Sequence, residues 1–462
     1  MDKKGENKMK KKIFVTTMMF FAMLFMVCAF TPQQAEAKTK TYTIKGPNHV
    51  PAAVKKSSSY TSATKNWLQI QYYLKKLQKG GGKLVLEKGT YNINNTLYVP
   101  ANTTIELMPG ATLKKTSKTV KIGKTKIKPA NNMFVLVSYN KKDKKNASKD
   151  YKGPGNIKFI GHGETSVIDL SYVKDAHGIS ASHNQNVTFE GLTFKGENGG
   201  HYIELAGTKN VTIQNNYFGA SKSSTHSKFY NKEAINIDTA DSVTKGFTLA
   251  WSKKDQTPNV NITITDNVFD GMNRAIGTHK YSQKKDSKGK YSKNSKNVYH
   301  QDIKITNNEF KNIYDNAIFM VNWKNTTIDN NTFTNIGVNN KRKTSTARHA
   351  IGGGGVVGIT ITNNTFTKVV NGSAVALKRT ANSGTGSKYY PTQVYVTDEE
   401  MELMKTNNVV DCTGETGSYG TNSNYKNYDV LIILGDADRG KAGSTSWGIN
   451  LKTKEIIPKK KK

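Results

Sequence analysis

Apolar and polar residues alternate in short segments that recur through the middle of the chain. Two consecutive examples are residues 186–194 (NVTFEGLTF) and 210–218 (NVTIQNNYF), each followed by a second strand-like segment. Alternation with a period of two indicates a strand with one buried face. Equivalent segments start at positions 156, 186, 210, 261, 302, 325 and 358, at intervals of 30, 24, 51, 41, 23 and 33 residues. Such a repeat predicts a solenoid, in which each coil buries its apolar face only against its neighbours.

Paired polar residues fall at one register of this repeat. Because asparagine tolerates the left-handed backbone, and its amide can bond to an amide one coil away, we expect a ladder of side chains along the stack. The predicted fold class is therefore all-β, a right-handed single-stranded parallel β-helix. The pairs are Asn215-Asn216, Asp266-Asn267, Asn307-Asn308, Asn330-Asn331 and Asn363-Asn364.

The segments on either side of the repeat predict how the stack ends. After a polar linker, Trp67, Ile70, Leu74 and Leu77 recur at helical spacing and glycines 80–82 end the helix, which we expect to cap one end of the stack. Beyond residue 380 the periodicity fades. Residues 381–462 are expected to form either a cap at the other end or a small separate module, with a lysine tail.

The first 37 residues have the pattern of a signal peptide. Lysines at 10–12 precede an apolar run at 13–30, and residues 35–37 (AEA) have the small-x-small form of a cleavage site. The predicted domains are a signal peptide (1–37), an N-terminal cap with the first coils (38–140), β-helix repeats with insertions (141–380) and the C-terminal part (381–462). The mature chain is expected to be secreted, and Cys412 is its one cysteine, which excludes a disulfide-stapled scaffold.

The N-terminal helix, its glycine stop, residues 84–91 (LVLEKGTY) and residues 109–113 (PGATL) resemble the entrance of the pectate lyase and polygalacturonase superfamily. The resemblance implies a parallel β-helix and a polysaccharide as the substrate class. The Asp-Asp and Asn-Thr-Asp signatures of polygalacturonases are missing, and only Leu377-Lys378-Arg379 is similar to their Arg-Ile-Lys motif. The family's catalytic residues are therefore not transferred to this chain.

The net charge of +35 bears on the expected partner. A field of this sign favours polyanions such as an acidic polysaccharide or a cell-wall polymer, while the alternative is a solvated lysine-rich surface. The sequence contains no nucleic-acid recognition module, glycine-rich phosphate loop or histidine-pair zinc motif. We expect an extracellular, cell-wall-associated monomer that is not held in a membrane after cleavage.

Aligning the second segment of each coil places the candidate chemistry on one outward face. The segments are residues 177–182, 201–206, 233–238, 274–279, 316–321, 349–354 and 373–378. Stacking puts Asp238 beside His279, with Glu204 diagonally about 8 Å from Asp238. The neighbours of Glu204 are Ser180 and Asn236, neither a cation, so burial could raise its pKa. Insertions at 219–232, 239–258, 280–301 and 337–348 border this face and could wall a groove.

Two carboxyl groups in different environments match the acid and base of glycoside hydrolysis. In this hypothesis Glu204 is the general acid, Asp238 the base or nucleophile, and His279 keeps Asp238 ionised. The expected substrate-binding residues are His201, Glu233, Asn236, Arg274, His349, Lys378 and Arg379.

Three alternatives use the same residues differently. Glu233 between His201 and Arg274 could be a purely structural ion-pair ladder. A lyase could use His279, Arg274, Lys378 and Tyr202 for elimination from a uronic acid, with Asp238 as a calcium ligand. A non-catalytic adhesin could bind wall polymers or host glycans. The sequence requires no cofactor, and calcium is the one metal it suggests.

Overall fold

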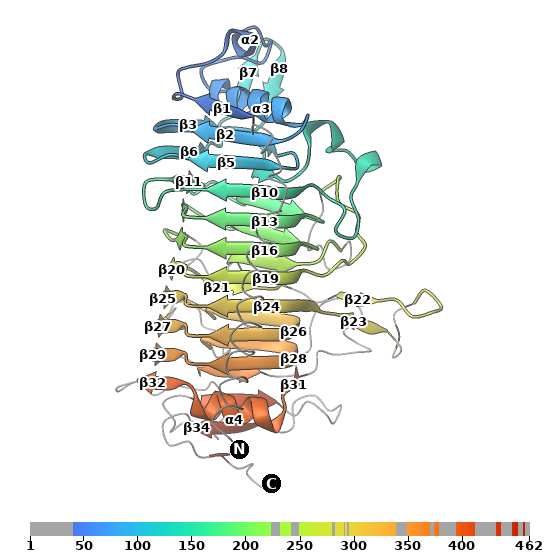
Figure 1. Ribbon diagram of the computed structural model, residues 1–462, viewed down its shortest axis with the longest axis vertical. Helices are drawn as coiled ribbons and strands as arrows, with labels where there is room; N and C mark the ends of the chain where they lie inside the picture. Colours follow the sequence, from blue (N-terminus) through green and yellow to red (C-terminus); the bar gives the residue numbers. More distant parts are fainter. Residues whose placement is uncertain are drawn as a thin grey trace, which may run out of the picture. The chain divides into compact units, whose positions relative to one another are not determined.

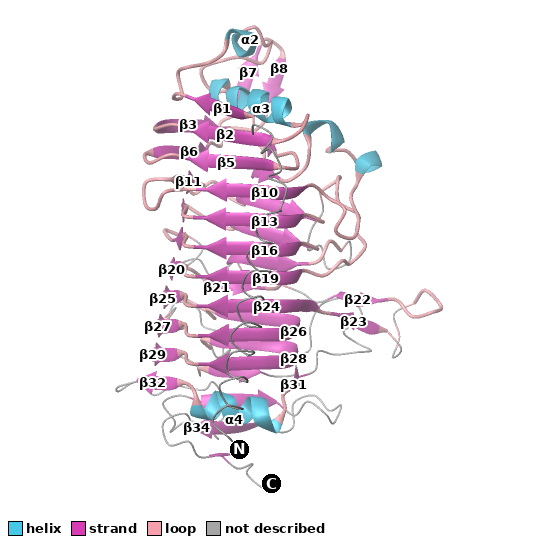
Figure 2. Cartoon of the chain, in the orientation of Figure 1, coloured by secondary structure: helices cyan, strands magenta, loops and turns pink. Residues whose placement is uncertain are grey.

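A computed structural model of the chain describes residues 40–222, 232–241, 249–279, 282–290, 292, 295–338, 349–369, 374–377, 394–411, 431–435, 446–450 and 456–457. The expected signal peptide, Lys378, Arg379, Cys412 and the lysine tail lie outside these residues. Residues 41–462 form one compact unit. This unit consists of parallel strands stacked coil on coil, so the predicted parallel β-helix is confirmed (Figure 1, Figure 2).

Each coil opens with one strand, the starting strand. The starting strands of successive coils pair with one another in parallel. Isoleucine, valine and phenylalanine alternate inward along these strands, as the periodicity predicts. The starting strands are β2 (Gly82–Leu86), β5 (Thr103–Leu107), β10 (Gly155–Ile160), β13 (Gln185–Glu190), β16 (Lys209–Gln214), β19 (Val260–Thr265) and β24 (His300–Thr306).

The finishing strands form a second row within the same sheet and carry the candidate site. They are β4 (Leu97–Tyr98), β9 (Asn132–Val135), β12 (His177–Ser182), β15 (Ile203–Ala206), β18 (Glu233–Asp238), β21 (Arg274–Gly277) and β30 (Val375–Leu377). In two later coils the finishing strand continues into the next starting strand, as β26 (Ile318–Asp329) and β28 (Ile351–Thr362). The sequence predicts two separate strands there. Left-handed residues such as Asn322 and Gly355 instead let one strand bend without a break.

A third row of strands forms a separate, ten-stranded parallel sheet. Along the chain, these strands come after a starting strand and before a finishing strand. Its inward phenylalanines stack from coil to coil with ring centroids 4.8–5.0 Å apart. The strands are β3 (Gly89–Ile93), β6 (Ala111–Lys115), β11 (Val167–Asp169), β14 (Thr193–Lys195), β17 (Tyr217–Phe218), β20 (Val268–Asp270), β25 (Glu309–Ile313), β27 (Thr332–Ile336), β29 (Thr365–Val369) and β32 (Val409–Asp411).

The predicted asparagine ladder is present at the turn between the starting strand and this third row. Asn308 shows the pattern: its amide donates to Oδ1 of Asn331 at 3.0 Å and to the Ile264 carbonyl at 2.9 Å. The buried series continues through Asn216, Asn267, Asn308, Asn331, Asn364 and Asn408. A second, exposed ladder joins the left-handed residues Asn102, Asn156, Asn186, Asn210 and Asn261.

The β1 end of the stack carries the predicted helix, α3 (Lys65–Leu77), which packs Ile70, Leu74 and Leu77 into the core. The preceding residues are not simply a polar linker, since they contain β1 (Thr41–Ile44), paired with β2, and α2 (Ala52–Lys55). The other short elements of this region are the hairpin of β7 (Val120–Ile122) and β8 (Thr125–Ile127), η1 (Tyr139–Lys141) and η2 (Lys144–Asn146).

Described residues beyond 380 extend the stack. β31 (Val394–Tyr395) pairs with β28 and β33 (Leu431–Gly435) pairs with β30, both in parallel. Helix α4 (Asp398–Thr406) begins with a capping box of Thr397 and Glu400, and Glu400 accepts a hydrogen bond from the Ile359 amide of β28. The remaining strands are β34 (Ser446–Asn450), β35 (Ile456–Ile457) and the hairpin of β22 (Ser282–Lys284) and β23 (Lys296–Val298).

None of the helices within the described residues combines the length and the apolar character that a bilayer span requires.

Candidate active site

The finishing strands bring the predicted residues into the expected rows. Glu204 on β15 pairs with Ser180 on one side and Asn236 on the other. Asp238 lies two residues beyond Asn236 on β18, diagonal to Glu204. The short strands hold these positions because their alternate residues are core isoleucines and leucines, which fix the register.

Glu204 is a buried carboxyl group with few compensating contacts. Its side chain is 11% exposed, accepts a hydrogen bond from the Ser180 hydroxyl at 3.0 Å and lies 3.5 Å from Nδ1 of His177. Burial raises the pKa of Glu204 to about 7, while the Ser180 hydrogen bond opposes the rise and the charge of Asp238 adds to it. Glu204 is therefore partly protonated at neutral pH.

His279 bridges two other carboxylates. Its Nε2 lies 2.6 Å from Glu233, and its Nδ1 lies 3.4 Å from Oδ2 of Asp238, whose Oδ1 also accepts the His279 backbone N–H at 3.2 Å. Burial opposes protonation of His279, but Glu233 and Asp238 outweigh it and raise its pKa to about 10. His279 is thus an imidazolium at neutral pH, and it lies between Glu233 and Asp238.

Glu233 is the anchor of this cluster. Its side chain is fully buried, and Nη1 of Arg274 lies 2.7 Å from it. Burial alone would raise the pKa of Glu233, yet His279 and Arg274 hold it well below its usual range. Arg274 is oriented in turn by Asp315 at 3.3 Å and by the Phe319 ring at 4.4 Å. Glu233 therefore fixes the position and the charge of His279.

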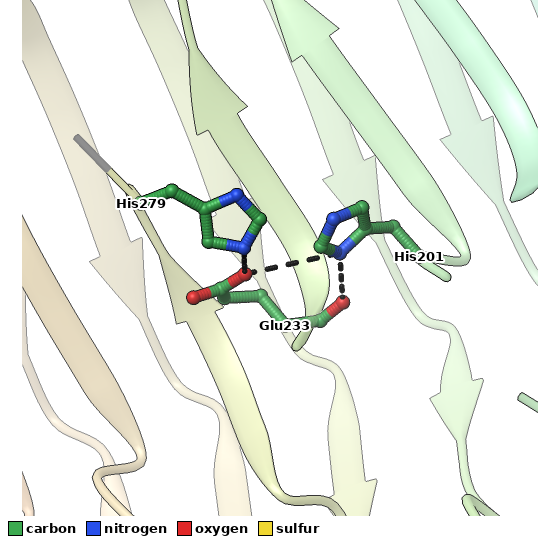
Figure 3. A group of neighbouring side chains, drawn as sticks. All are labelled: His201, Glu233 and His279. Carbon is green, nitrogen blue, oxygen red and sulfur yellow. Dashed lines mark hydrogen bonds and ion pairs between the residues drawn. The ribbon is translucent and has the colours of Figure 1, made fainter. Parts of the chain in front are cut away.

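His201 completes the cluster from the neighbouring coil. Figure 3 shows its ring beside Glu233, with Nδ1 2.7 Å from the Glu233 carbonyl oxygen and 3.8 Å from the carboxylate. Burial and the positive charge of His279 hold the pKa of His201 well below its usual range. His201 is therefore neutral, and because a carbonyl oxygen only accepts, its Nδ1 carries the proton.

His201, Glu233 and His279 also offer three ligand-type atoms within 4.8 Å of one another. A metal would need an unprotonated His279 and a free Glu233 carboxylate. In this cluster His279 is protonated and Glu233 is already paired with Arg274. A divalent cation at this cluster would have to displace the proton of His279 and the Arg274 contact of Glu233.

Three buried polar atoms beside Glu204 have no hydrogen-bond partner among the described residues: Nδ1 of His177, Oδ1 of Asn236 and Oδ2 of Asp238. Nδ1 of His177 lies 3.5 Å from Glu204, and Oδ2 of Asp238 lies 3.4 Å from Nδ1 of His279. Neither contact has hydrogen-bonding geometry. Most buried polar atoms in proteins are hydrogen-bonded, and unpaired ones also occur elsewhere in the described residues, as at Asn94 and Asn322. The rim of the site consists of His177, His279 and Glu204, whose side chains are 22%, 18% and 11% exposed.

The substrate contacts expected of Glu233 and His201 stay a prediction, and both residues, like Asn236 and Asp238, are almost fully buried. The Glu233 side chain is fully buried and that of His201 is only 3% exposed, so both support His279 from behind. His349 is also buried and lies on a later coil, where its backbone N–H donates to Asn316.

Two residues of the cluster, His177 and Asp315, were not among the predicted site residues. His177 occupies the same position in its coil as His201, so the repeat register contained the signal. Asp315 lies just before the aligned segment of its coil, and no pattern identified it.

The insertions expected to wall a groove lie partly outside the described residues. The described part of one, residues 249–258, packs Trp251 with Ala206 and Ala240. Ser252 in this segment also forms a hydrogen bond with Ser182 at 2.7 Å. This insertion therefore lies against the finishing strands beside Asp238, while the groove itself stays a prediction.

Comparisons with known proteins complete the description. No family model matches the chain. The chain is similar to plasmin and fibronectin-binding protein A of Streptococcus pneumoniae, with 25% identity over 253 residues, which are 51% of this chain and 32% of that protein. It thus spans about a third of that relative's length.

Among solved structures, the chain is similar to PfbA, a surface adhesin of Streptococcus pneumoniae (TM-score 0.49, 19% identity, 70% of this chain and 81% of that chain). A family 28 exopolygalacturonase of Yersinia enterocolitica is also similar (TM-score 0.43, 13% identity, 82% and 77%). The stacked parallel strands confirm the fold that the N-terminal motif implied.

Proposed function

We propose that the chain is an extracellular glycoside hydrolase acting on a polysaccharide, with acidic polymers favoured. The observation that carries the proposal is the contrast between two neighbouring carboxyl groups. Burial raises the pKa of Glu204 to about 7, whereas Asp238 lies against the imidazolium of His279. One group that can donate a proton and one that can accept a proton or attack are the two parts that glycoside hydrolysis requires.

In the proposed reaction Glu204 donates its proton to the oxygen of the leaving sugar as the glycosidic bond breaks. Asp238 either removes a proton from the attacking water or attacks the sugar carbon itself, and because its side chain is 2% exposed, both routes require the site to open at Asp238 when substrate binds. His177 lies 3.5 Å from Glu204 with its side chain 22% exposed, so in this proposal it contacts the sugar, whereas the buried Asn236 supports Glu204 from the neighbouring strand. His279 does not exchange protons in this scheme, because its role is to hold charge.

The preference for an acidic polymer rests on the net charge of +35, and the extracellular location on the signal-peptide pattern. The relative from Streptococcus pneumoniae, whose name describes plasmin and fibronectin binding, is compatible with a surface location. It also favours a second candidate function, that of a non-catalytic adhesin.

Product analysis on a panel of acidic polysaccharides separates these functions. A hydrolase releases reducing ends without new ultraviolet absorbance, because water adds across the broken bond. A lyase releases chains with an absorbing unsaturated uronide, and that result would replace the proposed reaction. Binding without any release of reducing ends would support the adhesin.

A further inference from the structure

The hairpin of β7 and β8 at the β1 end of the stack carries a concentrated positive charge (Figure 1). Lys121 on β7 is directly opposite Lys126 on β8, and Lys124 lies in the turn between them. Lys118 and Lys128 flank the two strands. All five lysines are exposed, and none of them has an ion pair within the described part of the chain.

Nothing in the surrounding sequence offsets this charge. Between Glu106 and Asp143 the chain contains lysines but no acidic residue. Like charges directly opposite each other destabilise a strand pair, so Lys121 and Lys126 weaken the hairpin that presents them. On the starting strands, by contrast, Lys158 and Lys304 each lie between threonines of adjacent coils. The hairpin therefore differs from an ordinary solvated lysine surface.

The chemistry of the hairpin narrows the class of ligand. On its other face Val120 is buried, and Ile122 and Ile127 are half-buried, so no exposed apolar side chain is available to enter a bilayer. The first arginine of the chain is Arg274, so the hairpin lacks the bidentate forks that recognise single phosphate groups. Lysines act as separate point charges, which suits a polymer with repeated single anionic groups.

We infer that this hairpin, with Lys118 and Lys128, is a binding surface for a linear acidic polysaccharide. The hairpin lies on a different part of the chain from the acid and base site. The inference therefore holds even if the chain cleaves nothing. If the chain is a hydrolase, the hairpin retains the long polymer while the finishing strands act on it.

The test compares two full-length variants with the same change in net charge. In the hairpin variant, Lys121, Lys124, Lys126 and Lys128 become Gln. In the control, Lys158, Lys195, Lys304 and Lys324, which are exposed on other strands, become Gln. With polygalacturonate at about 0.15 M ionic strength, where the screening length is about 8 Å, we expect binding to weaken about tenfold in the hairpin variant, or ~1.4 kcal/mol. The control should stay within about twofold, because distant charges are screened.

Equal weakening in both variants would show that net charge alone matters and would overturn the inference, as would unchanged binding by the hairpin variant. A hairpin-dependent affinity for phosphatidylglycerol vesicles or polyphosphate, without one for polygalacturonate, would also overturn it. A variant with the same four lysines changed to Arg should retain binding, and melting curves verify folding. If the hairpin variant binds the polymer more weakly but still releases reducing ends at the unmodified rate at saturating substrate, the hairpin acts separately from the acid and base site.

Discussion

At the scale of single residues, the chemistry of the site depends on which groups contact two buried glutamates. Glu204 and Glu233 lie on adjacent strands, and both are removed from water. Glu233 meets Arg274 and His279, which hold its pKa low, whereas Glu204 meets the Ser180 hydroxyl, and burial raises its pKa to about 7. Burial penalises the charged form of both, and direct contact with Arg274 and His279 outweighs it at Glu233, whereas the charges of His279 and Lys232 do not outweigh it at Glu204.

Changing Ser180 to Ala should move the pH dependence of cleavage upwards. The Ser180 hydroxyl donates to the charged form of Glu204, so its removal raises the pKa of Glu204 further and keeps the acid protonated to higher pH. The basic limb of kcat/KM against pH, expected near pH 7 in the unmodified protein, should shift to higher pH. Ser182→Ala is the matched control, because Ser182 bonds to Ser252 and should leave the limb in place. A shift of the basic limb to lower pH in Ser180→Ala would contradict the assignment of Glu204.

Replacing His279 with Gln should change how stability depends on pH. The folded-state pKa of His279 is raised from 6.5 to about 10, so its contribution is complete below pH 6.5 and is lost as the pH rises towards 10. The gap in Tm between the unmodified protein and His279→Gln should therefore be larger at pH 6.5 than at pH 10. His177→Gln is the control, because burial lowers the pKa of His177 to about 4. A gap for His279→Gln that is constant over this range would rule out the charged bridge.

At the scale of elements, the asparagine ladder fixes the coils relative to one another. The Asn308 side chain accepts from the backbone and amide of Asn267 and donates to Asn331. A side chain of this kind satisfies backbone groups at a turn that cannot pair with strands. The ladder therefore sets the spacing on which the alignment of the site residues depends.

Asn308→Ala should destabilise the protein by about 3 kcal/mol, because it leaves the buried Asn267 backbone N–H without its acceptor and the Ile264 carbonyl without the Asn308 donor. The control is Asn307→Gly, next in sequence. Asn307 is at the outer side of the turn with φ of 57°, a conformation that glycine adopts freely, so its loss should cost less than about 1 kcal/mol. Chemical denaturation measures both changes. Equal losses would mean that the buried ladder adds nothing beyond turn conformation.

The sequence predicts most of these elements because the repeat is a local pattern. The interval between asparagines places Glu204 beside Ser180 and Asn236, and the structure confirms both neighbours. The same alignment could not show that the His279 side chain contacts Glu233 as well as Asp238. The strand register gives the position of a residue but not the direction of its side chain. It also missed β1, whose four residues become a strand only by pairing with β2.

At the scale of the whole molecule, charge is distributed unevenly. The hairpin concentrates lysines that have no acidic partner among the described residues, whereas the cluster on the finishing strands pairs its cations with Glu233, Asp238 and Asp315. Cations paired in this way hold charged groups in place, and unpaired ones are free for a polymer. The proposed hydrolase and the alternative adhesin share the lysine surface and differ only in whether Glu204 performs chemistry.

The most direct test of the central claim is reducing-end release from acidic polysaccharides by the unmodified protein and by Glu204→Gln, measured in parallel. Gln keeps the shape of the side chain but cannot donate the proton. We predict release by the unmodified protein and a loss of at least about 100-fold in the variant, the scale of a positioned general acid, with an unchanged Tm. Equal release by both proteins, or binding without release by the unmodified protein, would contradict the assignment of Glu204 as the catalytic acid.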